Sequence, residues 1–209
     1  MRTRKSAATR KAEIVEAALR LADRLGPDRM STEAVANAVG ITQAGLFRHF
    51  PRKQVLWEAV ADHIGTMMEE GWAEALRGKA RPGDKIRALV VAQLRLIRAT
   101  PAIPAILFSR ELHTDNDGLR TAFLALLGRF HGRIAGLVEE GIDAGEWDAD
   151  LDPGDAAFLI LGLVQGLAVR WSVAGRGFDL VAEGERLLEL LLRGFARPPA
   201  GTARPEPRS

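Results

Sequence analysis

The chain has 209 residues, 47% of them hydrophobic, with four histidines and no cysteine. This length allows one domain or two small ones with a buried core, and the lack of cysteine excludes disulfides, thiolate metal sites and a thiol nucleophile. The formal net charge is only +2, but residues 1–55 carry 11 Lys/Arg against 5 Asp/Glu, which leaves the remainder mildly acidic. A basic first quarter on an acidic remainder favours a polyanion as the partner of the N-terminal part alone.

The first predicted helix follows a short basic tail. We expect residues 1–8 to be disordered, and two interpretations of their charges stay open: a solubilising tail, or an arm that touches DNA phosphates or the minor groove. Thr9 is the predicted N-cap, and Gly26-Pro27-Asp28 ends the helix. Its apolar positions recur at helical spacing and are Ile14, Ala18, Leu21 and Leu25.

Residues 31–53 have the pattern of two short helices joined by a tight turn, followed by the basic start of a longer helix. The first helix is capped by Ser31 or Thr32 and ends at Gly40, and the second begins after Thr42. A turn of this kind needs a backbone that accepts positive φ, which glycine does readily. The apolar positions are Val35, Val39, Ile41 and Leu46. This spacing is typical of a helix-turn-helix, whose second helix lies in the DNA major groove.

The segment TEAVANAVGITQAGLFRHFPRK resembles the N-terminal helix-turn-helix of TetR/AcrR-type bacterial transcriptional regulators. Counting the preceding helix, the resemblance covers roughly residues 10–58, and it is densest over GITQAGLFRHFPRK. It implies a DNA-binding head at 9–55 with its motif at 32–50 and an effector-binding and dimerisation body at 56–196. The chain has no credible strand pattern, so we predict an all-α fold of about nine helices, and the Pro-rich, polar residues 197–209 are predicted to be a second disordered tail. Repression is the default mode that the family implies.

The predicted DNA-contacting residues are Thr32, Thr42, Gln43, Ala44, Gly45, Phe47, Arg48, His49 and Lys53. Gln43 suits adenine and Arg48 suits guanine, each worth about 1–3 kcal/mol of discrimination. The resemblance assigns phosphate contacts to Thr32 and Lys53, and to His49 unless that residue is merely structural. The family usually has Tyr at position 47, so Phe47 lacks a hydroxyl and offers only van der Waals contact, for example with a thymine methyl.

Two cations, Arg52 and Lys53, open the next predicted helix, which runs from Lys53 to Leu76. Cations in a first turn are unfavourable to the helix dipole, so their presence indicates an external anion such as a DNA phosphate. A break at Arg81-Pro82-Gly83-Asp84 precedes a helix that ends at Thr100-Pro101. The remaining expected elements are a short helix in PAIPAILFSREL interrupted by Pro104, a polar loop at 113–118, and helices at 119–144, 154–174 and 179–196.

The most apolar run, residues 156–169, is predicted to be too short to span a membrane and to pack in an interface instead. The last two helices carry more apolar residues than one chain can bury, so we expect a homodimer that reads a pseudo-palindromic operator. The predicted interface residues are Leu159, Gly162, Leu163, Gly166, Leu187 and Leu191.

The family resemblance implies an effector pocket in the body, and its lining favours a small, mostly apolar molecule. The candidate residues are Leu94, Ile103, Leu107, Phe108, Phe123, Leu127, Phe130, His131, Gln165 and Trp171. A stripe of apolar residues in a helix is also what an ordinary core requires. A ligand would act by favouring a position of the helix at 53–76 that misplaces the two heads on DNA.

Other classes of protein fit the sequence less well. The histidines are scattered and no HExxH, G-x-S-x-G or phosphate-binding glycine loop is present, so we expect no enzyme, cofactor or metal site. The acidic residues 143–155 lack EF-hand spacing. A helical protein-interaction adaptor with a relic DNA-binding head is the alternative, and the intact Gly40, Thr42 and Lys53 count against it. We expect a cytoplasmic protein, associated with the nucleoid when bound to DNA, that makes no contact with membranes.

Overall fold

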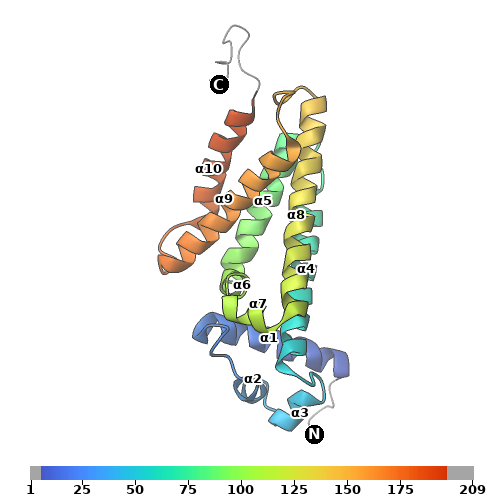
Figure 1. The fold of residues 1–209 in the computed structure, drawn as a ribbon, viewed down its shortest axis with the longest axis vertical. Coiled ribbons are helices and arrows are strands. Elements are labelled where there is room, and N and C mark those ends of the chain that lie inside the picture. Colours follow the sequence, from blue (N-terminus) through green and yellow to red (C-terminus); the bar gives the residue numbers. More distant parts are fainter. Residues whose placement is uncertain (1–5, 197–209) are drawn as a thin grey trace.

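The computed structural model describes residues 6–196, and that part of the chain contains helices and no strand, as the sequence predicts. The helices are α1 (Ala7–Leu25), α2 (Thr32–Ala38), α3 (Gln43–Phe47), α4 (Lys53–Leu76), α5 (Pro82–Ala99), α6 (Ala102–Leu107), α7 (Arg110–Asp115), α8 (Asp117–Asp143), α9 (Pro153–Val173) and α10 (Leu180–Phe195) (Figure 1). The basic residues at positions 2–5 and the predicted tail at 197–209 lie outside the described residues.

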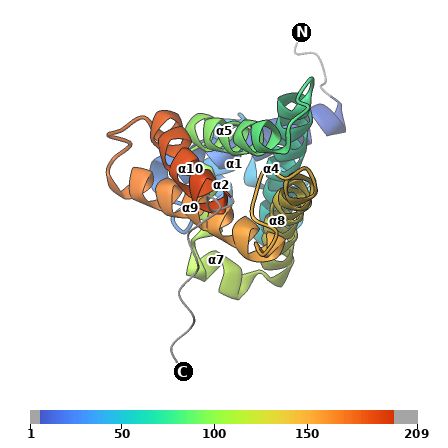
Figure 2. The ribbon, with the colours of Figure 1, turned by 90° about the horizontal axis from the view of Figure 1, so that it is seen from above.

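The molecule is elongated, with α1, α2 and α3 forming a head at one end (Figure 1). The long helices α4, α5 and α8 run away from the head along the long axis, while α9 and α10 lie on one side of them (Figures 1 and 2). In the body, α4 packs on α5 and α8, and α10 packs on α5 and α9. The head contacts the body through α1, which packs on α4 and α6.

The first helix begins earlier than predicted, because Ser6 and not Thr9 is its N-cap. The Ser6 hydroxyl oxygen accepts a hydrogen bond from the Thr9 backbone N–H at 3.1 Å. Thr9 therefore lies within the first turn, and the ordered chain extends into the segment that the sequence predicts as a disordered tail. Both residues have hydroxyl side chains, so composition alone could not choose between them.

Helix α4 has the predicted bounds, from Lys53 to Leu76. Trp57, Ile64 and Trp72 are fully buried along it, which shows that one face of this helix contributes to the core over its whole length. Because α4 passes through positions 55 and 56 without a break, the predicted boundary between head and body falls inside a helix. That boundary stays a prediction.

Two expectations for the segment after α5 are wrong. Pro104 does not interrupt a helix, because α6 begins at Ala102 and the ring lies in the first turn, where its missing N–H is not needed. The expected polar loop at 113–118 is helical apart from Asn116, because its first three residues end α7 and its last two begin α8. Ser109 caps α7 by accepting from the Leu112 N–H at 3.2 Å. Asn116 then caps α8 and donates to the Gln54 carbonyl at 3.1 Å, which ties α8 to α4. The body therefore has one helix more than predicted.

Helix α9 is also longer than its apolar core suggests. It starts with Pro153 in the first turn and runs for 21 residues, of which an 18-residue stretch has a mean hydropathy of 1.7. By length and composition alone the whole helix could cross a membrane, which is weak evidence for a span, and the predicted apolar run 156–169 is only part of it. The core helix of a soluble protein has the same features, and Ile160, Val164 and Trp171 of α9 are buried against the other helices of the body.

Candidate nucleic-acid interface and ligand cavity

The helix-turn-helix has the geometry that the sequence predicts. Gly40 adopts a φ of 67° between α2 and α3, the region in which glycine is favoured. Thr42 caps α3 by accepting from the Gly45 N–H at 3.1 Å. Leu46 and Phe50 are buried beneath α3, so its orientation relative to α1 and α2 is fixed by packing.

The predicted DNA-contacting residues come together on the outer side of α3 and at the start of α2 and α4. Thr42, Gln43, Ala44, Phe47 and Arg48 are exposed, Thr32, His49 and Lys53 are half-buried, and Gly45 is buried. Gly45 relieves crowding here, because a Cβ would lie 3.3 Å from the Thr42 hydroxyl oxygen, a contact that needs Thr42 to shift by a few tenths of an ångström. The exposed face therefore offers an amide, a guanidinium and an aromatic ring from one short helix.

The start of α4 is open to an anion. Arg52 is the N-cap residue, but it makes no side-chain capping bond, and the first turn contains no acidic residue. Lys53 is the first helical residue. The N-terminus of this 24-residue helix thus carries a lysine and uncapped N–H groups, the combination that suits a phosphate.

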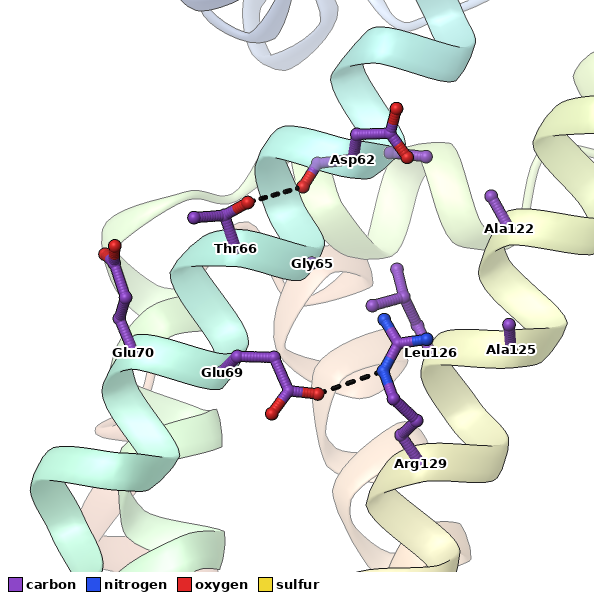
Figure 3. Close-up of a pocket in the computed structure, with 10 residues that line it drawn as sticks. Asp62, Gly65, Thr66, Glu69, Glu70, Ala122, Ala125, Leu126 and Arg129 are labelled. Carbon is purple, nitrogen blue, oxygen red and sulfur yellow. Dashed lines mark hydrogen bonds and ion pairs between the residues drawn. The ribbon is translucent and has the colours of Figure 1, made fainter.

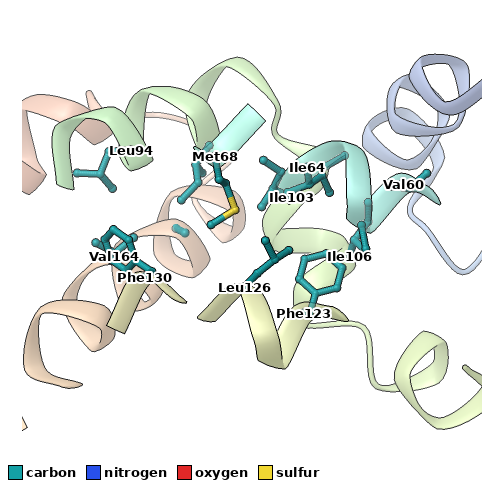
Figure 4. Close-up of a cluster of buried hydrophobic side chains, with 14 of the residues drawn as sticks. Val60, Ile64, Met68, Leu94, Ile103, Ile106, Phe123, Leu126, Phe130 and Val164 are labelled. Atoms are coloured by element: carbon teal, nitrogen blue, oxygen red, sulfur yellow. The ribbon is translucent and has the colours of Figure 1, made fainter. Parts of the chain in front are cut away.

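An apolar cavity lies in the body between α4, α5, α6, α8 and α9. Its lining consists of Met68, Gln93, Ile97, Ile103, Pro104, Leu107, Leu127, Phe130, Leu161, Val164, Gln165 and Ala168. Figure 4 shows Met68, Ile103, Phe130 and Val164 in the surrounding cluster of buried side chains. The free volume is about 40 Å³, enough for little more than a water molecule. Any larger ligand has to displace side chains.

The cavity contains half of the predicted pocket residues, namely Ile103, Leu107, Leu127, Phe130 and Gln165. The other five lie outside the cavity lining. Leu94 packs against Gly184, and Phe108 is exposed. Phe123 packs edge-on against His113, the His131 ring packs at a tilt against Phe158, and Trp171 donates to the Phe178 carbonyl. Met68, Ile97 and Leu161 were missed by the prediction, although each stands at helical spacing among apolar neighbours.

A groove of about 600 Å³, which the sequence did not predict, runs between α4 and α8 (Figure 3). Small residues on both helices, Gly65 and Ala122 among them, keep it open. The Glu69 carboxylate lies at its edge and accepts from Nε of Arg129 at 2.9 Å and from Nη2 of Arg133 at 2.6 Å. Pairs of small residues one turn apart are the sequence signal that could have located it.

The groove and the cavity lie on two sides of the same contact between α4 and α8. Leu126 faces the groove, while the next residue, Leu127, lines the cavity. Gly65 lines the groove, and Met68, almost one turn further along α4, lines the cavity. A Cβ at position 65 would lie 3.0 Å from Cδ2 of Leu126, so this glycine allows Leu126 to close the contact.

The outer sides of α9 and α10 form an apolar face. The most exposed large side chains are Phe158, Leu159 and Val173 on α9 and Leu190 on α10. Among the predicted interface residues, Leu159, Gly162 and Gly166 are exposed, and Leu163, Leu187 and Leu191 are half-buried. Apart from the adjoining residues and backbone of α9 itself, no described atom lies within 4 Å of a Cβ placed on Gly162 or Gly166, so a second helix can approach this face closely.

Comparisons with known proteins agree with this architecture. The family model described as "Bacterial regulatory proteins, tetR family" matches residues 14–60, and the model described as "YsiA-like protein, C-terminal region" matches residues 60–194. Similar proteins include the fatty acid metabolism regulator protein of Bacillus subtilis, which is 26% identical over 88% of this chain and 94% of its own length. The transcriptional regulator AcrR of Shigella flexneri is 26% identical over 93% of both chains.

Solved structures show the same fold. The crystal structure of the transcriptional regulator FadR from Bacillus subtilis in complex with stearoyl-CoA superposes with a TM-score of 0.76 at 22% identity, covering 88% of this chain and 98% of that one. The two family models together span residues 14–194, and the described head contains the helix-turn-helix that the first of them represents. The chain belongs to the TetR family of bacterial regulatory proteins and is a DNA-binding transcriptional regulator.

Proposed function

We propose that this regulator is a homodimeric repressor that leaves its operator when a molecule with a long apolar chain enters the body. The apolar cavity carries this proposal, because its lining is almost wholly hydrocarbon and its polar groups are limited to Gln93 and Gln165. Two comparisons support the choice of ligand: a relative from Bacillus subtilis is named a fatty acid metabolism regulator, and the regulator FadR from Bacillus subtilis was solved with stearoyl-CoA. The structure of the latter shows the same fold as this chain.

On DNA, α3 of each protomer enters the major groove, where Gln43 and Arg48 reach base edges and Phe47 packs against a thymine methyl. All three side chains are exposed on one side of the head. Lys53 and the uncapped N-terminus of α4 hold a backbone phosphate beside them. Base contacts then select the operator, and phosphate contacts fix the position of the head on it.

The apolar face of α9 and α10 is the dimer interface. An exposed helix face of this composition needs a cover, and the open glycines Gly162 and Gly166 suit a helix crossing at close range. A second copy meets this need with the same surface, since a two-fold interface is self-complementary. The resulting dimer presents two heads to two half-sites of a pseudo-palindrome.

The cavity reaches the head through α6. Ile103 and Leu107 of α6 line the cavity, and Ser109, two residues further on, donates its hydroxyl hydrogen to Oδ1 of Asp28 at 2.6 Å. Asp28 lies in the loop between α1 and α2. Because the free volume is so small, an acyl chain has to push the lining outwards, and a displaced α6 pulls on this loop. The ligand thereby favours a head position that does not fit the operator.

The DNA-binding part is tested with a duplex that the protein selects from a random library. Lys53→Ala should weaken binding to all duplexes and lower the slope of log K against log salt by about 0.9 for each phosphate that the variant no longer neutralises. Lys79→Ala is the matched control, because Lys79 is exposed in the loop between α4 and α5. Equal slopes for Lys53→Ala and wild type would contradict the phosphate contact.

The effector part is tested by release of the selected duplex on addition of stearoyl-CoA. Leu107→Trp fills the cavity and should abolish release, while Phe108→Trp, at the neighbouring exposed position, should release like wild type. A wild-type protein that stays on DNA at saturating stearoyl-CoA and at saturating free fatty acid would rule out a long apolar chain as effector. The fold and the DNA contacts would be unaffected by that result.

A further inference from the structure

The first turns of α2 and α3 are joined by a hydrogen bond between two side chains of the head. Nε2 of Gln43 donates to the hydroxyl oxygen of Thr32 at 2.9 Å. Neither side chain is needed to cap its own helix, because Ser31 caps α2 by accepting from the Ala34 N–H, and Thr42 caps α3. Thr32 and Gln43 are therefore left to bond each other.

This bond leaves a defined set of hydrogen-bonding groups. A glutamine amide has two N–H donors and one carbonyl acceptor, and Thr32 accepts from one of the donors. The second N–H and Oε1 of Gln43 stay available on the exposed side of α3. One donor beside one acceptor is the pattern that pairs with N7 and the N6 amino group of adenine in the major groove. The Thr32 hydroxyl keeps its own hydrogen, which can be donated to a phosphate.

We infer that Thr32 is a positioning residue for base recognition: it holds the Gln43 amide in the orientation that reads an adenine in each half-site. This inference rests on the proposed entry of α3 into the major groove. A free glutamine has several rotamers and loses them on binding, whereas one already bonded to Thr32 has lost much of that freedom before DNA arrives. The hydroxyl of Thr32 thus affects which base is chosen, beyond any contact that it makes with the DNA backbone.

A phosphate contact alone predicts something different. Contacts to the backbone carry no sequence information, so their removal weakens all duplexes by the same factor. Removal of a group that orients a base-reading side chain lowers the preference at one base pair and leaves the preferences at the others unchanged. The measurement is therefore the base preference at each base pair of the site, and the affinity for the selected duplex serves only as a reference.

The experiment uses the full-length protein and the duplex that it selects, with each base pair replaced in turn. Gln43→Ala should lower discrimination at one A·T pair per half-site by about fivefold or more, which identifies the pair that Gln43 reads. Thr32→Val keeps the shape of the side chain but removes the hydroxyl, and it should lower discrimination at that same pair by about threefold or more. Thr32→Ser restores the hydroxyl and should read the pair as wild type does.

Each outcome bears on one statement. If Thr32→Val binds every duplex more weakly by one common factor, the inference is wrong and Thr32 is a phosphate contact only. If Gln43→Ala changes no preference, Gln43 reads no base and the inference is wrong as well. A wild-type protein that prefers no duplex contradicts the proposed function itself, which is a separate result.

Discussion

The apolar face of α9 and α10 makes a quantitative prediction about dimerisation. Leu159 is 56% exposed on that face. Full burial of a leucine is worth about 1.5–3 kcal/mol, so burial of the remaining half contributes about 1 to 1.5 kcal/mol in each protomer. The residue occurs twice in a two-fold interface, which gives about 2 to 3 kcal/mol in all. Leu159→Glu also buries two unpaired carboxylates, so the dissociation constant of the dimer should rise at least about 30-fold.

Sedimentation velocity over a range of protein concentrations measures this constant. The matched control is Leu25→Glu, which makes the same chemical change at a leucine that is 44% exposed at the end of α1, in the head. The control should dimerise like wild type. A Leu159→Glu protein that is as dimeric as wild type would refute the assignment of this face, and a monomeric wild-type protein at micromolar concentration would refute the dimer.

Two further predictions concern stability. The hydrogen bond from Arg87 lowers the pKa of the Glu189 carboxyl below its ordinary value of 4.5, so this pair stabilises the fold fully above that pH and progressively less as pH falls through the lowered value. Urea unfolding should therefore show Arg87→Met slightly less stable than wild type at pH 7 and equal to it in strong acid; a difference that persists in acid would have another cause. Gly141→Ala would place a methyl 2.1 Å from the buried ring of Trp147 and should cost about 1–3 kcal/mol, whereas Gly136→Ala, with open space around it, should stabilise by up to about 1 kcal/mol. Equal unfolding midpoints for these two variants would contradict the packing described for α8.

The head could be predicted from the sequence because its structure depends on short-range signals. Gly40 is a turn residue between two helical patterns, and Thr42 is a capping residue directly before the second. Both effects act over a few residues, so position in the chain is enough to identify them. The start of α4 at Lys53 has no such capping signal, because Arg52 makes no side-chain capping bond.

The cavity could be predicted only in part, because helical periodicity reports which side of a helix is apolar and not what lies opposite. Leu107 and Phe108 are adjacent and both apolar, yet one lines the cavity and the other is 45% exposed. The difference arises at the end of α6, where Phe108 is the C-cap and the chain turns towards α7. The groove was missed for a related reason: small residues one turn apart mark a close approach on each helix, but they do not say that Gly65 of α4 meets Leu126 of α8.

Two polar contacts between described residues tie the head to the body, and we expect them to report on different events. Ser109 bonds Asp28 and adjoins the helix that lines the cavity, so a ligand in the cavity should disturb this contact. Arg176, in the loop between α9 and α10, pairs with Asp23 of α1, so this contact should respond to the hairpin that carries the proposed dimer face. Within the body, Asn116 bonds the Gln54 carbonyl, which joins α8 to the start of α4 beside Lys53. On the proposed function, a ligand that moves the first contact while the dimer fixes the second is expected to rotate the head relative to its half-site.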